Sequence, residues 1–138
     1  MLDDSKHRLF VYGTLLRDQP QHRLIAAQTF LCKAKTQPAF RMMLIRDQPF
    51  SYPALVRLPR PELHATPISI LGEVYEVDDA CLAKLDAYEG VSQGLYLRQT
   101  IALVDQDRPA IGYVYQLSVA GCVDCGPSWS EFIQQRQD

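Results

Sequence analysis

The sequence lacks any long hydrophobic run. None of its apolar stretches approaches the roughly 18 residues that a membrane-spanning helix requires. The first residues of the chain are polar and mixed in charge, and they lack the apolar centre of a secretory signal. From these absences we expect a cytoplasmic protein with no membrane partner.

An excess of charge of one sign is also missing. The chain has 14 Lys and Arg residues against 16 Asp and Glu residues, which gives a net charge of -2 at pH 7. Nucleic-acid binders usually have a strongly basic surface, so we expect no nucleic-acid partner. Internal repeats and low-complexity segments are absent as well. The length of 138 residues and the hydrophobic fraction of 47% predict a single domain over residues 1–138.

Several common catalytic motifs do not occur. The sequence has neither glycine-rich phosphate-binding pattern, and no serine lies in a Gly-x-Ser-x-Gly elbow. The three histidines, at positions 7, 22 and 64, are scattered without the spacing of metal ligands, so we expect no metal. Among the four cysteines only Cys122 and Cys125 form a Cys-x-x-Cys pair. Free thiols in a reducing compartment are the ordinary interpretation, and a redox or metal module stays open.

The hydrophobic pattern that is present predicts a strand-rich chain with one clear internal helix. We expect strands over residues 9–12, 30–34, 40–45, 52–58, 68–77, 96–104 and 110–117. Pro20 could open a short helix through Gln28, and Asp78 or Asp79 is a good N-cap for a helix through Tyr88. Residues 129–133 could form a last helix. Because strands and helices do not alternate regularly, we expect an α+β fold, a small mixed β-sheet or closed β-barrel with flanking helices.

The end of the predicted internal helix carries the strongest candidate for an acid/base. Leu82 and Leu85 lie on one apolar stripe, and Glu89 falls at the next position of that stripe. Gly90 supplies a left-handed helix terminus. Burial and the negative end of the helix dipole would both raise the pKa of the Glu89 carboxyl, toward the range useful for proton transfer. A solvated carboxylate is the simpler interpretation of this local pattern, and Asp86 is a rival on a neighbouring face.

A second candidate element lies near the start of the chain, where a strand breaks at a glycine. Gly13 and its neighbours Tyr12, Thr14 and Leu15 could bring backbone N–H groups close to a ligand. Such groups can hold a carboxylate or a developing oxyanion. A single glycine after a strand is, however, most often only a turn.

Tyrosines are the remaining candidates for the site. Tyr52, which precedes Pro53, could line a pocket. Tyr96, Tyr113 and Tyr115 could offer hydroxyl groups to a substrate. In strands, tyrosines more often pack across to a neighbouring strand, so their positions alone do not decide between the two roles.

Together these motifs resemble the γ-glutamylcyclotransferase-like (AIG2-like) family, and they are closest to its γ-glutamylamine cyclotransferase branch. The resemblance covers about residues 8–117 and rests on the order of its parts. These parts are Val11–Leu15 with Gln19–His22, Tyr52–Leu55, Gly72–Tyr75, Leu85–Gly90 with Leu95–Arg98, and Ala110–Tyr115. The segment from Cys122 to Cys125 is not part of the family pattern.

The resemblance implies a compact mixed barrel with a pocket at one mouth, a small γ-glutamyl substrate and no cofactor. The loop from Tyr12 to Leu15 would cradle the γ-glutamyl group, Tyr52 and Tyr96 would help to bind it, and Glu89 would be the catalytic acid/base. The substrate's own α-amino group would attack its γ-carbonyl group, and the products would be 5-oxoproline and a free amine. The leaving amine and the oligomeric state are not identified by this resemblance.

Two other functions stay open on the sequence. The protein could be a non-catalytic member of the same fold that binds a carboxylate metabolite or a protein partner. It could also be the redox or metal module suggested by Cys122 and Cys125.

Overall fold

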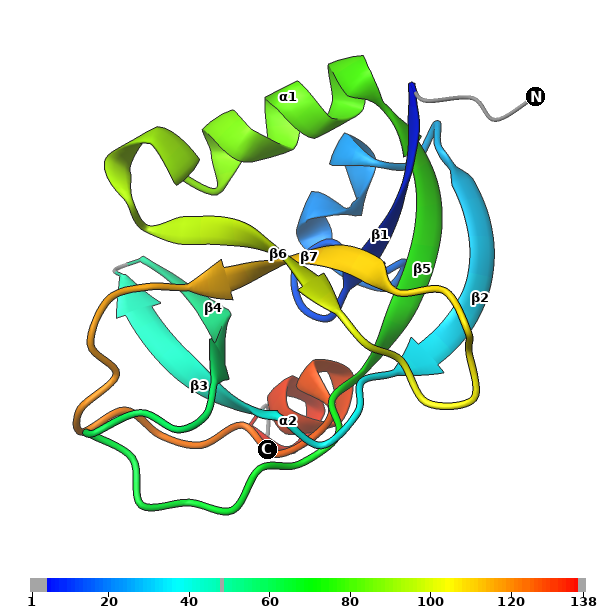
Figure 1. Ribbon diagram of the computed structural model, residues 1–138. Coiled ribbons are helices and arrows are strands. Elements are labelled where there is room, and N and C mark those ends of the chain that lie inside the picture. Colours follow the sequence, from blue (N-terminus) through cyan, green and yellow to red (C-terminus); the bar gives the residue numbers. More distant parts are fainter. Residues whose placement is uncertain (1–4, 48, 137–138) are drawn as a thin grey trace.

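The computed structural model describes residues 5–47 and 49–136 (Figure 1). The strands in these residues are β1 (Lys6–Val11), β2 (Thr29–Lys35), β3 (Phe40–Asp47), β4 (Phe50–Arg57), β5 (Leu71–Asp78), β6 (Tyr96–Ile101) and β7 (Ala110–Tyr115). The helices are α1 (Asp79–Tyr88), α2 (Trp129–Gln135) and the short 3-10 helices η1 (Pro20–Leu24) and η2 (Val91–Gln93). The strand-rich α+β class expected from the sequence is confirmed.

The strands form one mixed sheet and one separate hairpin. The five-stranded sheet has the order β2-β5-β1-β7-β6, and β3 pairs with β4. Strand β1 lies antiparallel to β5 and parallel to β7. Because β1 is central, its residues Leu9, Phe10 and Val11 are all buried although they point to alternate faces. In Figure 1 the hairpin lies beside β7, and α1 crosses the opposite end of the molecule.

The prediction of a closed barrel is wrong. The edge strands β2 and β6 are not joined by a ladder of hydrogen bonds in the described residues. Just past their ends, a single bridge joins Thr36 to Leu103. The backbone N–H of Gln37 donates to Ala102 O at 2.9 Å, and that of Val104 donates to Lys35 O at 2.9 Å. Strand β6 itself ends at Ile101, before the end of the strand expected over residues 96–104, and these contacts involve the residues that follow it. The sheet therefore curves toward closure without completing it.

The helix expected from Pro20 through Gln28 is also shorter than predicted. It is a 3-10 helix that ends at Leu24, and turns follow it. The backbone N–H of Gln28 donates to Ile25 O at 2.9 Å, which is the spacing of a turn and not of an α-helix. The side chain of Gln28 meanwhile accepts a hydrogen bond from the Asp78 N–H at 3.0 Å. Tertiary contacts thus replace a second helical turn.

The segment that follows β7 runs along the outside of β3. Asp124 bridges to Met43, and the N–H groups of Leu44 and Cys125 donate to Val123 O and Met42 O, each at 2.8 Å. Helix α2 then begins at Trp129. The indole of this residue is buried and donates to Gln19 Oε1 at 3.1 Å. The C-terminal segment therefore fastens the turn before η1.

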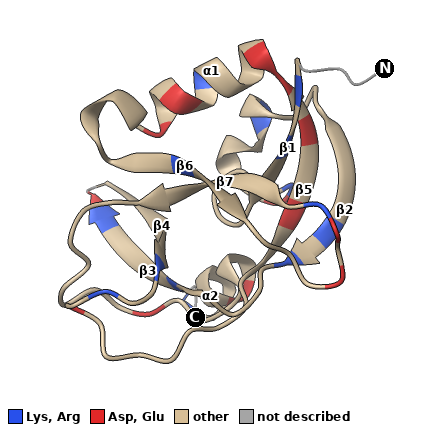
Figure 2. Ribbon diagram, in the orientation of Figure 1, with Lys and Arg blue, Asp and Glu red and all other residues tan. Residues whose placement is uncertain are grey.

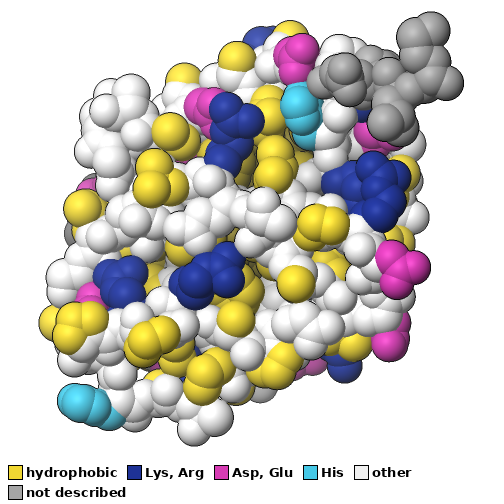
Figure 3. All heavy atoms as spheres, in the orientation of Figure 1, with side chains coloured by type: hydrophobic (Ala, Val, Ile, Leu, Met, Phe, Trp, Pro, Cys, Tyr) yellow, Lys and Arg dark blue, Asp and Glu magenta, His cyan; other side chains and the backbone are white. Residues whose placement is uncertain are grey.

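Charge is distributed over the whole molecule. Acidic and basic residues occur on helices and strands on all sides of the ribbon (Figure 2). On the face shown in Figure 3, the Lys and Arg side chains lie in separate groups, and some of these groups have Asp or Glu side chains beside them. In the part of the chain that the structure describes, no helix is long and apolar enough to cross a bilayer.

Candidate functional site

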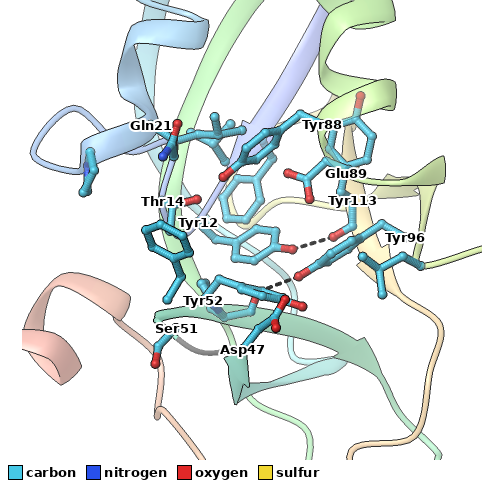
Figure 4. Close-up of a pocket in the computed structure, with 18 residues that line it drawn as sticks. Tyr12, Thr14, Gln21, Asp47, Ser51, Tyr52, Tyr88, Glu89, Tyr96 and Tyr113 are labelled. Atoms are coloured by element: carbon cyan, nitrogen blue, oxygen red, sulfur yellow. Dashed lines mark hydrogen bonds between the residues drawn. The ribbon is translucent and has the colours of Figure 1, made fainter. Parts of the chain in front are cut away.

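A cavity of about 480 Å³ lies where the ends of β1, β4, β6 and α1 meet (Figure 4). Its walls come from the loop after β1, the β3–β4 hairpin, the C-terminal end of α1, the start of β6 and β7. The cavity brings together the residues to which the family resemblance assigned a role, namely Tyr12, Gly13, Thr14, Leu15, Tyr52, Glu89 and Tyr96. Segments far apart in the chain therefore share one site, while the roles of these residues stay predictions.

Glu89 reaches the cavity because of how α1 begins and ends. The Asp78 carboxylate caps the helix by accepting from the Cys81 N–H at 2.8 Å, and the buried Leu82 and Leu85 hold one face against the sheet. Glu89 follows the last helical residue, and its N–H donates to Leu85 O at 2.8 Å. Gly90 then turns the chain away with a φ of 66°. The Glu89 side chain is thereby directed into the cavity (Figure 4).

The Glu89 carboxyl group has an unusual environment for an acid. Protein atoms surround it on most sides, although it keeps some exposure through the cavity. Within the described residues, no hydrogen-bond donor and no cation pairs with it. Burial without compensation disfavours the charged form and raises the pKa of Glu89 to about 8. The group can therefore both accept and donate a proton near neutral pH.

Asp86, the rival acid on α1, is occupied by other contacts. Its Oδ1 accepts from the Tyr113 hydroxyl at 2.7 Å, and its Oδ2 lies 3.1 Å from Arg98 Nη2. Asp86 does not line the cavity. Because both of its oxygens are engaged by side chains of β7 and β6, Asp86 is better suited to fixing these strands against α1 than to contacting a substrate.

The loop after β1 lines the cavity and has backbone N–H groups without an acceptor in the described residues. Its carbonyl groups are occupied: Gly13 O accepts from the Leu16 N–H at 3.0 Å, and Thr14 O accepts from the Gln21 N–H at 3.0 Å. Leu15 O is 2.9 Å from His22 Nδ1. Among the residues that the structure describes, none accepts from the N–H of Gly13, Thr14 or Leu15. These three donors are available to an anionic or carbonyl oxygen.

A buried carboxylate supports the loop from behind. Glu73 on β5 accepts from the Arg17 backbone N–H and from Arg17 Nε, each at 3.1 Å, and from the Tyr75 hydroxyl at 3.1 Å. These donors compensate the burial of its charge. Residue 17 is therefore fixed to the sheet, which limits how far the loop from Tyr12 to Leu15 can move.

The tyrosines around the cavity fall into two groups. The hydroxyl groups of Tyr12 and Tyr96 donate to Tyr113 O at 2.6 Å and to Pro53 O at 2.9 Å (Figure 4). Burial raises the pKa of both phenols, so they remain neutral. In the described residues, the hydroxyl groups of Tyr52 and Tyr88 have no hydrogen-bond partner and are free to contact a ligand.

Sequence reasoning missed part of the lining. Asp47, Phe50 and Ser51 enter the cavity from the β3–β4 hairpin, and Tyr88 enters from α1. Tyr88 could have been found from its position next to Glu89, whereas the hairpin residues carry no motif. Of the tyrosines left open by the sequence, Tyr113 lines the cavity; Tyr115 is not among the residues that line it.

The arrangement favours some ligands over others. Among the described residues that line the cavity there is no Lys, Arg or His, so a phosphate group would meet the Asp47 and Glu89 carboxyl groups without a compensating cation. In the described residues, no cluster of His, Cys, Asp and Glu could hold a metal ion. Outside the cavity, burial raises the pKa of Cys125 to about 12, which disfavours the thiolate that a redox motif needs.

Comparisons with known proteins agree with this architecture. Residues 9–130 match the family model described as gamma-glutamyl cyclotransferase, AIG2-like. The γ-glutamylaminecyclotransferase of Rattus norvegicus is 36% identical over 87 residues, which cover 59% of this chain and 54% of that protein. The chain thus spans about half the length of this relative.

Solved structures show the same fold. An AIG2-like protein of Mus musculus is 25% identical with a TM-score of 0.60, over 82% of this chain and 78% of that one. A uropathogenic E. coli-specific protein has a TM-score of 0.75 at 19% identity, over 94% of this chain and 96% of that one. Because the family model covers most of the sequence, we conclude that the chain belongs to the γ-glutamyl cyclotransferase, AIG2-like family.

Proposed function

We propose that this protein is a γ-glutamyl cyclotransferase that converts a small γ-glutamyl amine or peptide to 5-oxoproline and a free amine. The observation that carries the proposal is Glu89, a carboxyl group without a partner in the described residues and with a pKa raised to about 8. It lines the same cavity as a loop with three backbone N–H groups that no described residue accepts from. The relatives whose names describe this activity give it further support.

The reaction needs no nucleophile from the protein. The α-amino nitrogen of the substrate attacks its own γ-carbonyl carbon, and a new C–N bond closes the five-membered ring. Glu89 accepts the proton that this nitrogen loses. Because nucleophile and electrophile belong to one molecule, binding in a folded conformation supplies much of the rate enhancement.

Breakdown of the tetrahedral intermediate completes the reaction. The N–H groups of Gly13, Thr14 and Leu15 stabilise the oxyanion that develops on the γ-carbonyl oxygen. Glu89 then returns its proton to the nitrogen of the leaving amine, and the original amide C–N bond breaks. Atoms and protons balance without a water molecule or a cofactor, since one proton moves from the attacking to the leaving nitrogen.

The direct test is release of 5-oxoproline from a panel of γ-glutamyl amines and γ-glutamyl dipeptides. We expect at least one member of the panel to yield equimolar 5-oxoproline and amine. The rate should be proportional to protein concentration, and the activity should coelute with the protein in chromatography. If no member of the panel releases 5-oxoproline and its members nevertheless bind saturably to the folded protein, the result would favour a non-catalytic carboxylate binder instead.

The pH dependence of the reaction gives a second prediction. An α-amino group has an ordinary pKa of roughly 8, and the pKa of Glu89 is about 8. The reactive state of the Glu89 carboxyl group and the substrate's α-amino group carries one titrating proton between them. Below both pKa values both groups are protonated, so the amine cannot attack. Above both values this proton is lost, so none is left for the leaving amine. We expect kcat/KM to form a bell with its maximum near pH 8. An acid limb near the ordinary carboxyl pKa, measured by initial rates from pH 4 to 10, would contradict this role for a buried Glu89.

A further inference from the structure

The end of the cavity formed by the β3–β4 hairpin carries charge that the proposed reaction does not use. Asp47, the last residue of β3, is exposed and lines the cavity, and no described residue pairs with it. Among the described residues that line this cavity, none is a cation that could neutralise it. Phe50, which pairs with Asp47 across the hairpin, also lines the cavity and is 70% exposed, and Tyr52 is half-buried. An unpaired carboxylate next to exposed apolar surface is suited to an amphipathic cation.

Tyr52 lines the cavity together with Asp47 and Glu89. Its pKa is raised mainly by burial, and the charges of Asp47 and Glu89 both add to the shift. The phenol therefore lies within electrostatic reach of both carboxylates. In Figure 4, Glu89 extends from the end of α1, Asp47 extends from the hairpin, and the rings of Tyr12, Tyr52 and Tyr96 lie between them in this view.

The two carboxyl groups accordingly mark two ends of the cavity, Glu89 at the end of α1 and Asp47 at the β3–β4 hairpin. A γ-glutamyl group with its reacting amine at Glu89 and its carbonyl oxygen at the loop after β1 would direct the leaving amine along Tyr52, toward the hairpin. We propose, as an extension of the proposed function, that the leaving amine carries a second, positively charged group, which Asp47 recognises while its apolar stem packs on Phe50 and Tyr52.

The chemical class that fits is a diamine, or another amine with an ammonium group separated from the reacting nitrogen by a short alkyl chain. A neutral alkylamine would contact the same aromatic side chains without pairing with Asp47. An amine that bears only a carboxylate would be repelled by Asp47. Asp47 is thus a specificity-determining residue and not a catalytic one.

Three matched substrates test this inference: γ-glutamyl amides of 1,4-diaminobutane, n-pentylamine and 4-aminobutanoate, which are cationic, neutral and anionic. For the unmodified protein we expect kcat/KM to be about fivefold higher for the cationic than for the neutral amide, the size of a partly exposed ion pair. Higher ionic strength should reduce this ratio. In Asp47→Asn the ratio should fall to about one, and Asp47→Lys should favour the anionic amide.

The matched control is Asp107→Asn, which removes an exposed carboxylate that does not line the cavity and should keep the fivefold ratio. Turnover of the neutral amide with a ratio that Asp47→Asn does not change would overturn the inference and leave the proposed cyclotransferase intact. If the unmodified protein turns over none of the three amides or any other γ-glutamyl amide, the proposed function itself fails, and the inference fails with it.

Discussion

Replacing Glu89 by Gln should reduce kcat for 5-oxoproline release by about 10²- to 10⁴-fold, the range that a general acid/base contributes. Glutamine has nearly the same shape as glutamate and keeps the side chain in the cavity, but it cannot accept the proton of the attacking amine. Steady-state kinetics on any substrate that the unmodified protein turns over would measure the loss. Retention of more than a tenth of the activity would show that Glu89 is not the proton carrier.

A comparison with Asp86 separates chemistry from structure. Asp86→Asn removes the neighbouring acid on α1, which is paired with Tyr113 and Arg98 and does not line the cavity. We expect this variant to be less stable because two donors lose their charged acceptor. Its kcat should change much less than that of Glu89→Gln. If Asp86 were the proton carrier, the order of the two effects would be reversed.

Unfolding experiments on the same Glu89→Gln protein test whether the carboxyl group is buried. The folded pKa of about 8 lies above the ordinary carboxyl value, so folded Glu89 holds a proton that the unfolded chain releases. Its contribution to stability is complete below about pH 4.5 and is lost as the pH rises to about 8. Between these two pH values, the free energy of unfolding of the unmodified protein should therefore fall by a few kcal/mol relative to that of Glu89→Gln. The free energies of unfolding of both proteins can be measured by urea titration at several pH values. If the carboxyl group were solvated, the difference between them would not depend on pH.

Replacing Gly13 by Ala should disturb both the fold and the reaction. A Cβ atom at this position would come within 2.3 Å of Pro53 Cγ and 3.0 Å of Pro53 Cδ, and neither ring atom can rotate away. Either the loop or β4 must shift. We expect the free energy of unfolding to fall by about 1–3 kcal/mol, as in an overpacked core. Displacement of the N–H donors should slow 5-oxoproline release by about ten- to hundredfold.

A second substitution identifies the cause of this effect. Pro53→Ala removes the two ring atoms and leaves only Cβ, which would lie 3.7 Å from the new methyl group, an ordinary contact. The carbonyl of residue 53, which accepts from Tyr96, is unaffected. In the Pro53→Ala background, Gly13→Ala should lower the free energy of unfolding, measured by chemical denaturation, by less than about 1 kcal/mol. An equal cost in both backgrounds would show that close approach to β4 is not the reason for a glycine here.

Local sequence patterns were sufficient for most elements of the fold. Helix α1 follows from its Asp78 cap, its apolar stripe and the glycine after it, because all of these act within a few residues of one another. The strands follow from alternation and from turns rich in proline and aspartate. The two differences are that η1 ends at Leu24 and that the sheet does not close into a barrel. Both depend on contacts between residues far apart in the sequence, such as Gln28 with Asp78 and Thr36 with Leu103, which local patterns do not indicate.

For the site, the sequence by itself indicated the two parts to which the proposed function assigns chemistry. The glycine-broken strand end and the carboxyl group at a helix terminus are local features, and the order of the motifs indicated the family. Only the tertiary structure decided that these parts share one cavity, and that Asp47 and Phe50 line it too. It also decided that Asp86 is paired while Glu89 has no partner in the described residues. The reason is physical: burial, pairing and the pKa of a carboxyl group depend on which segments pack around it, and the position of the β3–β4 hairpin is set by contacts with β7 and the C-terminal segment, far from it in sequence.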